Sequence, residues 1–204
     1  MTSKITHDPM LHGRSMAENG TFRYALAQRA LHWLIALLVL GLLGAGMLLG
    51  YLGFDELKAR FGIETTNAIY AYHKTFGVIL LGLMVLRLIL RLSLGAPPYR
   101  EALQPYQRVL SRIVHGLFYV LLLAMPVLGW MATAAGGYPV QFFDMNLPGF
   151  IGKDEDLSST LFELHGLVAW VLIGLILLHA GAALTHWLVW KDGVMERMGL
   201  FARR

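Results

Sequence analysis

The sequence contains no cysteine and few charged residues. Without cysteine there is no disulfide framework, no cysteine-held iron–sulfur cluster, no thiolate-ligated haem and no covalent c-type haem attachment. Only 15% of the 204 residues are charged, whereas about a quarter are charged in a typical soluble domain. Hydrophobic residues make up 56% and the mean hydropathy is +0.57. This composition predicts an integral membrane protein.

A helix needs about 20 apolar residues to cross a bilayer, and four segments of the sequence are long and apolar enough. The predicted spans are residues 30–54, 67–92, 113–134 and 161–190, and Pro126 is expected to kink the third. No domain boundary interrupts them. The expected fold is therefore all-α: a polar tail over 1–22, then a single four-transmembrane-helix bundle over 23–204.

The loop charges predict the orientation of this bundle. Thirteen of the 17 basic residues lie before residue 30, within 87–112, or from residue 191 onward. The connections 51–74 and 134–165 hold the other four, together with eight of the 13 acids. Because basic loops stay inside, both termini are expected in the cytoplasm. The apolar stretch 141–151 is too short to span and is expected to lie along the outer membrane surface.

Histidine is the residue type that points to chemistry. An ionisable side chain in a hydrocarbon layer is costly and marks a functional site by default. Two histidines, His7 and His12, lie in the polar tail and are expected to be solvated. The other six lie in or just beyond the predicted spans: His32, His73, His115, His165, His179 and His186. With no cysteine present, this set suggests metal ligands, and haem iron is the first candidate.

His165 and His179 are fourteen residues apart in the last span. That spacing is about 21 Å along a helix and about 40° around it, so the two imidazoles share a face. One helix can therefore offer a ligand near each membrane surface, which predicts two non-covalent b haems with two histidines on each iron. His73 is the single candidate partner for His165 at the outer level.

The inner level is ambiguous by position alone. His32 or His115 can face His179 or His186 there. Depth favours His32 with His179, because both lie a few residues inside the apolar layer while His186 reaches the water interface. His115 is then expected to hydrogen-bond across helices or to a haem propionate. Arg87 is expected to pair with a propionate of the inner haem. The glycines of spans one, two and four are expected to let helices approach or to make room for a flat macrocycle. They are Gly41, Gly44, Gly46, Gly77, Gly82, Gly174 and Gly181.

An iron with two histidines has no open position, so outer-sphere electron transfer is the expected chemistry. A lipid quinone is the expected partner because it resides in the bilayer. His186, Trp187 and Lys191 lie where a quinone head group can dock and take protons from the cytoplasm.

Several strings resemble the bacterial cytochrome b-561 family of small di-haem inner-membrane cytochromes. They are ALHWLIALLVL (30–40), YHKTFGVILLGLMVLRLILR (72–91), PVLGW (126–130), ELHGLVAWVLIGLILLHAGAALTHWLVWKD (163–192) and MGLFARR (198–204). The resemblance implies that His32 and His179 hold the cytoplasmic-side haem, and that His73 and His165 hold the periplasmic-side haem. It also implies an oxidoreductase of the superoxide oxidase type, which passes electrons from superoxide to ubiquinone. The outer face is acidic overall, but Lys58, Arg60 and Lys74 are expected to form a local positive funnel near His73.

Two other readings remain open. The chain is alternatively the membrane cytochrome subunit of a hydrogenase or dehydrogenase, with a catalytic partner subunit. An alternative from a different functional class is a haem-free transporter that uses histidine to bind metal ions or relay protons. Proton relays usually combine histidine with buried carboxylates, and Glu163 is the only acid within or bordering a predicted span. That scarcity counts against transport.

Overall fold

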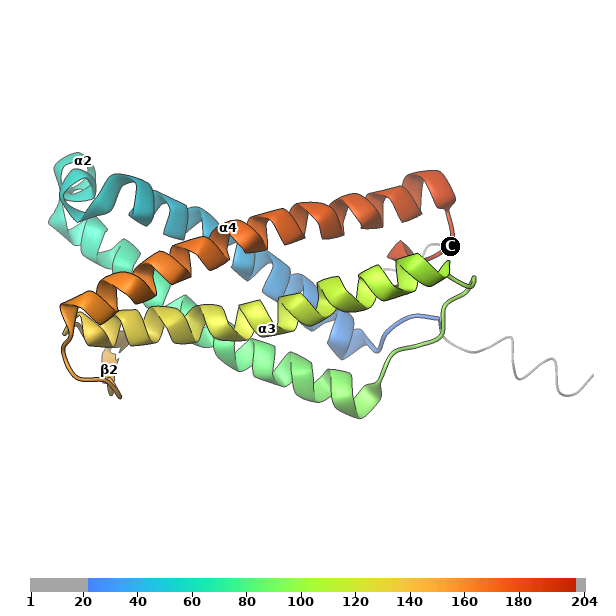
Figure 1. Cartoon of the computed structure of the whole chain (residues 1–204), viewed down its shortest axis with the longest axis horizontal. Coiled ribbons are helices and arrows are strands. Elements are labelled where there is room, and N and C mark those ends of the chain that lie inside the picture. The colour runs from blue at the N-terminus through green and yellow to red at the C-terminus, as the bar shows by residue number, and fades with distance from the viewer. Residues whose placement is uncertain (1–21, 201–204) are drawn as a thin grey trace, which may run out of the picture.

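The computed structural model describes residues 22–200. His7, His12 and nearly all of the predicted tail therefore lie outside the described residues. The described chain is helical except for one small hairpin (Figure 1). Its elements are α2 (Leu26–Leu94), α3 (Pro105–Ala135), β1 (Val140–Phe142), β2 (Met145–Leu147), α4 (Glu155–Thr185), the π-helical turn η1 (His186–Trp190) and the 3₁₀ turn η2 (Met195–Arg197).

Helix α2 doubles back on itself (Figure 1). Gly53 and Gly62 have φ angles of +69° and +78°, which an L side chain rarely adopts. These two breaks divide α2 into arm one (26–52) and arm two (63–94), joined by a short helical link. The first break, at Gly53, falls within the last two residues of the predicted first span.

The two arms are tied together at their far ends by Gln28. Its buried side-chain amide donates to the carbonyl of Leu90 at 3.3 Å and to that of Gly95 at 3.2 Å. Gln28 lies near the start of arm one and Leu90 near the end of arm two. These hydrogen bonds hold the arms side by side.

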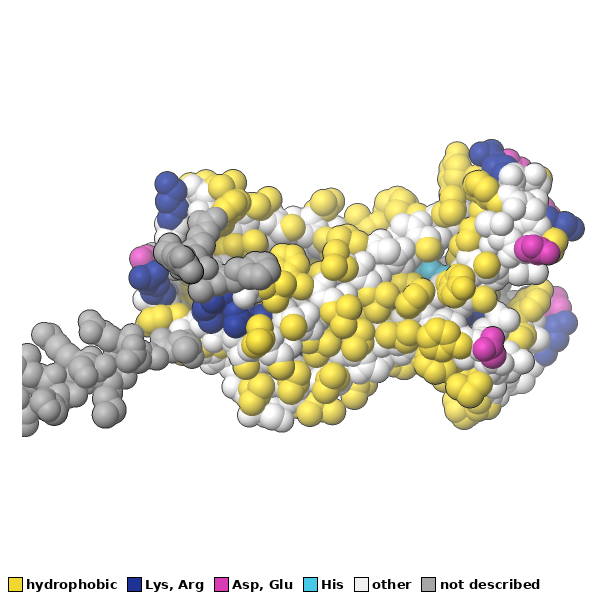
Figure 2. Space-filling view, turned by 180° about the vertical axis from the view of Figure 1, so that it is seen from behind, with side chains coloured by type: hydrophobic (Ala, Val, Ile, Leu, Met, Phe, Trp, Pro, Cys, Tyr) yellow, Lys and Arg dark blue, Asp and Glu magenta, His cyan; other side chains and the backbone are white. Residues whose placement is uncertain are grey.

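Among the described residues, three helices are long and apolar enough to cross a membrane: α2, α3 and the stretch Glu155–Trp190. Helices α3 and α4 begin earlier than the predicted spans, since Pro105 starts α3 and Asp154 caps α4 by accepting from the Leu157 N–H at 3.0 Å. Pro126 lies inside α3, which continues through it to Ala135. Apolar side chains cover the middle of the bundle, while charged ones gather at its ends (Figure 2).

The core fills the centre of the bundle with aliphatic side chains from both arms, α3 and α4. It consists of Leu31, Ile35, Val39, Leu80, Met84, Leu122, Val168 and Leu172. In α4, Val168 and Leu172 follow His165 by three and seven residues, so all three share one face. The interior stripe of α4 is thus apolar between its two histidines.

The connection between α3 and α4 contains a hairpin that the sequence analysis did not predict. Strands β1 and β2 pair antiparallel, with Val140 opposite Leu147. The buried hydroxyl of Thr75 in arm two accepts from the Phe143 N–H at 3.1 Å and donates to the Gln141 carbonyl at 3.4 Å. The hairpin is therefore fastened to arm two, two residues beyond His73.

At the opposite end, the chain after η1 packs back onto the start of arm one. The Tyr24 N–H donates to the Arg197 carbonyl at 3.1 Å, and the Trp33 indole donates to the Met198 carbonyl at 2.9 Å. Both ends of the described chain therefore lie at the same end of the bundle (Figure 1).

Candidate functional site

His73 of arm two faces His165 of α4. Their ring centres are 6.3 Å apart and the ring planes are inclined by 73°. This level is called the outer level, and that of His32 and His179 the inner level, after the sides on which the loop charges predict them. Nδ1 of His165 lies 3.1 Å from the Met125 carbonyl, to which it donates. That hydrogen bond directs the proton to Nδ1 and leaves Nε2 with a lone pair that can bind a metal. Nδ1 of His73 is buried without a hydrogen-bond partner in the described part of the chain.

At the inner level, His32 of arm one faces His179 of α4, with ring centres 6.2 Å apart and planes inclined by 78°. A third ring, that of His115, lies closer to His179, at 5.4 Å. Two nitrogens bonded to one metal at about 2 Å each hold the ring centres roughly 6 Å apart. The separation of His32 from His179 matches this value, and that of His115 from His179 is too short.

The fourteen-residue spacing recurs in all four long segments of the bundle. The pairs are His32 and Gly46 in arm one, His73 and Arg87 in arm two, His115 and Gly129 in α3, and His165 and His179 in α4. Each pair places one residue at each level of the bundle interior. The sequence analysis found this spacing only in α4, although the other three pairs carry the same signal.

The two glycines of this set lie against the outer histidines. A Cβ atom on Gly46 would be 3.1 Å from Cε1 of His73, and one on Gly129 would be 3.1 Å from Cε1 of His165. Such contacts are tighter than ordinary van der Waals packing, so any larger residue displaces a ring. Gly129 was not singled out from the sequence.

Arg87 and His115 are the two residues of this fourteen-residue set that lie at the inner level beside the facing pair of His32 and His179. Nη2 of Arg87 lies 3.3 Å from Nδ1 of His32, and Nη1 donates to the Gln28 carbonyl at 3.3 Å. Nδ1 of His115 donates to the Ser111 carbonyl one turn earlier, at 2.6 Å. The structure therefore brings Arg87 to the His32 ring, as expected of a residue beside the inner site.

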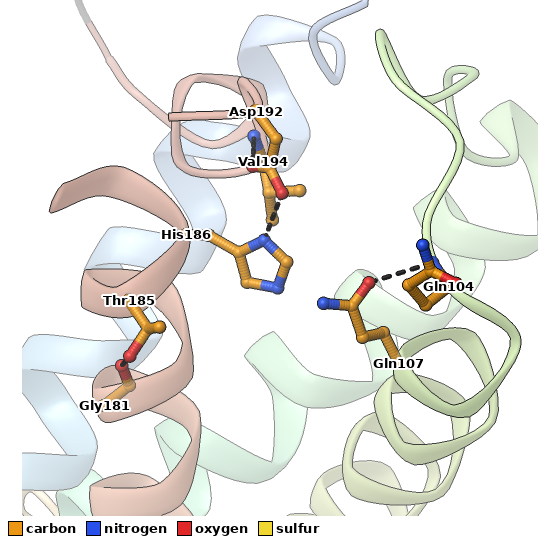
Figure 3. Close-up of polar contacts among 7 residues, drawn as sticks. All are labelled: Gln104, Gln107, Gly181, Thr185, His186, Asp192 and Val194. Atoms are coloured by element: carbon orange, nitrogen blue, oxygen red, sulfur yellow. Dashed lines mark hydrogen bonds and ion pairs between the residues drawn. The ribbon is translucent and has the colours of Figure 1, made fainter. Parts of the chain in front are cut away.

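His186 forms a second polar cluster beyond the inner level. Its Nδ1 lies 2.5 Å from a carboxylate oxygen of Asp192, and both side chains are nearly buried. Figure 3 shows the other ring nitrogen pointing toward the side-chain amide of Gln107 in α3. The Gln107 carbonyl oxygen accepts from the Gln104 N–H at 2.9 Å, which turns its NH₂ group to His186.

The other two predicted quinone residues lie beside this cluster. Trp187 is half-buried in η1. Lys191 follows η1 in the left-handed conformation, with its N–H donating to the His186 carbonyl at 2.7 Å and its side chain exposed. Asp192 and Gln107 were not predicted, although Asp192 stands in the quoted string that ends in WKD.

The three predicted funnel cations have different surroundings. Nζ of Lys74 donates to the Pro139 carbonyl at 3.1 Å, immediately beside His73 in sequence. Arg60 pairs with Glu56 at 2.6 Å, so its charge is offset. Lys58 is exposed on the link between the two arms. Two of the three cations thus remain for attracting an anion.

A family model described as Prokaryotic cytochrome b561 matches residues 23–199. The chain belongs to this family. Membership makes it a bacterial membrane cytochrome that carries b-type haem and transfers electrons.

The curated relatives cover nearly the same part of the chain. Cytochrome b561 homolog 2 of Escherichia coli (strain K12) is 27% identical over 177 residues, which is 86% of this chain and 90% of the relative. Cytochrome b561 homolog 1 of the same organism is 29% identical over 180 residues, covering 86% and 96%. The Probable superoxide oxidase CybB of Yersinia pestis is 29% identical over 178 residues, covering 86% and 95%.

The residues fit the cofactor that the family implies. Each level offers two facing imidazoles at the separation that one iron requires. At the outer level, two glycines leave no room for larger side chains beside the rings. His115 and His186 lie outside these two pairs. The side chains that fit as ligands are therefore His32, His73, His165 and His179.

We expect Gly129→Ala to weaken haem binding at the outer level, because the added methyl group pushes the His165 ring off its position. Ligand displacement of this kind is expected to lower haem affinity by about tenfold or more. The measurement is a haem titration followed by the visible spectrum. Gly166→Ala is the matched control, since Gly166 adjoins His165 but has open space where its Cβ would lie. Equal affinities of the two variants would contradict the role of Gly129.

Proposed function

We propose that the protein holds two b haems, one at each level, and that each iron has two axial histidines. His73 and His165 hold the outer haem, and His32 and His179 hold the inner one. The single observation that carries this proposal is the separation of the facing ring centres, 6.3 Å and 6.2 Å. Arg87, beside His32, supplies a positive charge for the propionates of the inner haem.

In this proposal both arms of α2 cross the membrane, so the bundle has four spans with both termini in the cytoplasm. Gly53 and Gly62, where α2 turns back, then lie at the outer surface. The loop charges support this orientation, because the end that carries the termini holds most of the basic residues. Consequently His32 and His186 face the cytoplasm while His73 and the hairpin face outward.

The haems supply one-electron transfer between the two membrane surfaces. The protein residues supply the ligands, exclude water and handle protons at the inner end. The aliphatic core between the levels contains no charged side chain among the described residues. Electrons can therefore tunnel across this region, whereas protons have no polar path through it.

A lipid quinone is the proposed electron acceptor, bound near His186, Trp187 and Lys191. The second ring nitrogen of His186 and the NH₂ group of Gln107 face one another (Figure 3). A quinone carbonyl oxygen accepts a hydrogen bond from the Gln107 NH₂ group, and accepts one from His186 when that imidazole carries a proton on both nitrogens. Asp192 orients His186 and stabilises the imidazolium that forms when a proton arrives from the cytoplasm. Each quinone takes two electrons and two protons to become quinol.

Superoxide is the proposed electron donor at the outer level, in line with the relative from Yersinia pestis. Two superoxide anions give up two electrons and leave as dioxygen, which balances the reduction of one quinone to quinol. Lys74, held beside His73 by the Pro139 carbonyl, and Lys58 attract the anion. The charge of Arg60 is offset by Glu56, so Arg60 is not included among the residues that attract superoxide.

We expect alanine substitution of His73, His165, His32 or His179 to lower the haem content from two per chain to about one, because each iron loses an axial ligand. A pyridine haemochrome assay of the purified protein measures the content. His115→Ala is the control and keeps both haems, since His115 is too close to His179 to share an iron with it. Loss of a haem in His115→Ala, with none lost in His32→Ala, would reverse the assignment.

We expect His186→Ala to slow quinone reduction by about 100-fold, because general acid catalysis is removed, while both haems stay bound. Asp192→Asn has a smaller effect in the same direction. The assay follows reoxidation of the prereduced haems by a soluble quinone analogue. Thr185→Ala is the control, since its hydroxyl only bonds back to Gly181 within the helix (Figure 3). A normal rate in His186→Ala would exclude the site.

We expect Lys74→Glu to slow haem reduction by superoxide about tenfold at low salt, with the difference shrinking as ionic strength rises. Stopped-flow spectroscopy with a superoxide source measures the rate. Lys153→Glu is the control, because Lys153 lies on the same outer side but pairs with Glu155. If neither variant changes the rate, superoxide does not enter beside His73.

A further inference from the structure

The inner end of the bundle carries more guanidinium groups than the proposed haem sites use. Four of them, Arg23, Arg29, Arg91 and Arg197, gather around Tyr24 and Gly199. The guanidinium carbons of Arg91 and Arg197 lie 5.8 Å and 5.2 Å from the centre of the Tyr24 ring. Nη1 of Arg29 donates to the Gly199 carbonyl at 2.6 Å, and Arg23 donates to the same oxygen. A patch of basic side chains is visible at this end of the molecule (Figure 2).

Three N–H groups of this arginine cluster are buried without a hydrogen-bond partner in residues 22–200. They are Nε of Arg29, Nη1 of Arg91 and Nε of Arg197. Arg197 is only 6% exposed and stacks on Tyr99 at 3.8 Å. Within the same residues, no carboxylate forms an ion pair with Arg29, Arg91 or Arg197. Arg197 is buried as a whole residue, whereas Arg29 and Arg91 are half-buried and only the named nitrogens are covered. A covered donor without a partner is costly, and a bound ion is one way in which it is satisfied.

The cluster is distinct from the residues that face the inner haem. Arg87 points to His32 and to the Gln28 carbonyl, whereas Arg197 donates to the Pro97 carbonyl in the α2–α3 connection. The cluster thus joins three separate parts of the chain: the start of arm one, the connection after arm two, and the C-terminal turn. A ligand bound there contacts the cytoplasmic edge of the bundle.

We propose that this arginine cluster binds the phosphate group of an anionic phospholipid. Guanidinium groups from separate elements match an anion with several oxygens, and Arg is the residue best suited to phosphate. Basic pockets between helices on the cytoplasmic side are sites for anionic lipid head groups. Leu26 and Leu92, which flank the cluster in sequence, are 63% and 77% exposed and offer apolar surface to acyl chains. The choice of leaflet rests on the proposed orientation, but phosphate binding does not.

The test uses the haem-loaded protein in neutral detergent. Its melting temperature is measured against increasing phosphatidylglycerol, phosphatidylcholine with the same chains, or inorganic phosphate. We expect phosphatidylglycerol to raise the melting temperature, and phosphatidylcholine, whose phosphate is covered by a cation, to have little effect. Protection by inorganic phosphate as well would identify a free anion as a sufficient source. No protection by either phosphate source would overturn the proposal.

Two variants and a control assign the effect to the cluster. Arg29→Gln and Arg91→Gln are expected to weaken the apparent affinity by about tenfold or more, since each removes a charged donor. Arg112→Gln, an exposed arginine of α3 on the same side, is expected to leave it unchanged. If the two variants change the haem spectrum but leave the lipid affinity as it was, the cluster serves the haem and the proposal is wrong. These readouts do not depend on quinone or superoxide turnover.

Discussion

The distance between two facing imidazole rings is the constraint on which the rest of the bundle depends. Each pair of rings is about as far apart as one iron requires, at two levels separated by fourteen residues of helix. Four helical segments meet at each level, and in the proposed function only two of them supply a ligand there. The other two must leave room or stabilise charge. In these two segments the residue is glycine at the outer level, and it is Arg87 or His115 at the inner level.

The difference between segments that supply a ligand and segments that do not explains why histidine, glycine and arginine all recur at the fourteen-residue spacing. Gly46 and Gly129 approach the outer rings so closely that a methyl group there meets a ring carbon at 3.1 Å. Arg87, in contrast, lies beside His32 at the inner level. In the proposed orientation this level is near the cytoplasmic edge, where a charged side chain reaches water or a propionate at lower cost. The two levels are therefore built alike in geometry and differ in polarity, as their depths demand.

Much of this arrangement follows from the sequence, and the parts that do not have physical reasons. Hydropathy located the helices, and helical geometry brought His165 and His179 to one face. Depth favoured the pairing of His32 with His179, and the ring separations also distinguish His32 from His115, which lies at a similar depth. The hairpin was missed because its anchor is Thr75, a residue far away in sequence. The fold-back of α2 was predicted as two successive spans, but the two positive φ angles that turn the helix at Gly53 and Gly62 were not.

The dry core between the levels gives the polar groups at each end separate tasks. Val168, Leu172 and Met84 separate the outer histidines from the inner ones and provide no proton acceptor. Protons for a reduced acceptor must then enter from the side on which that acceptor binds. The proposed function puts this acceptor at the cytoplasmic end, where His186 and Asp192 form a nearly buried hydrogen-bonded pair. Negative charge leaving the outer surface would thus meet protons taken from the inner one, and each turnover would move charge across the membrane.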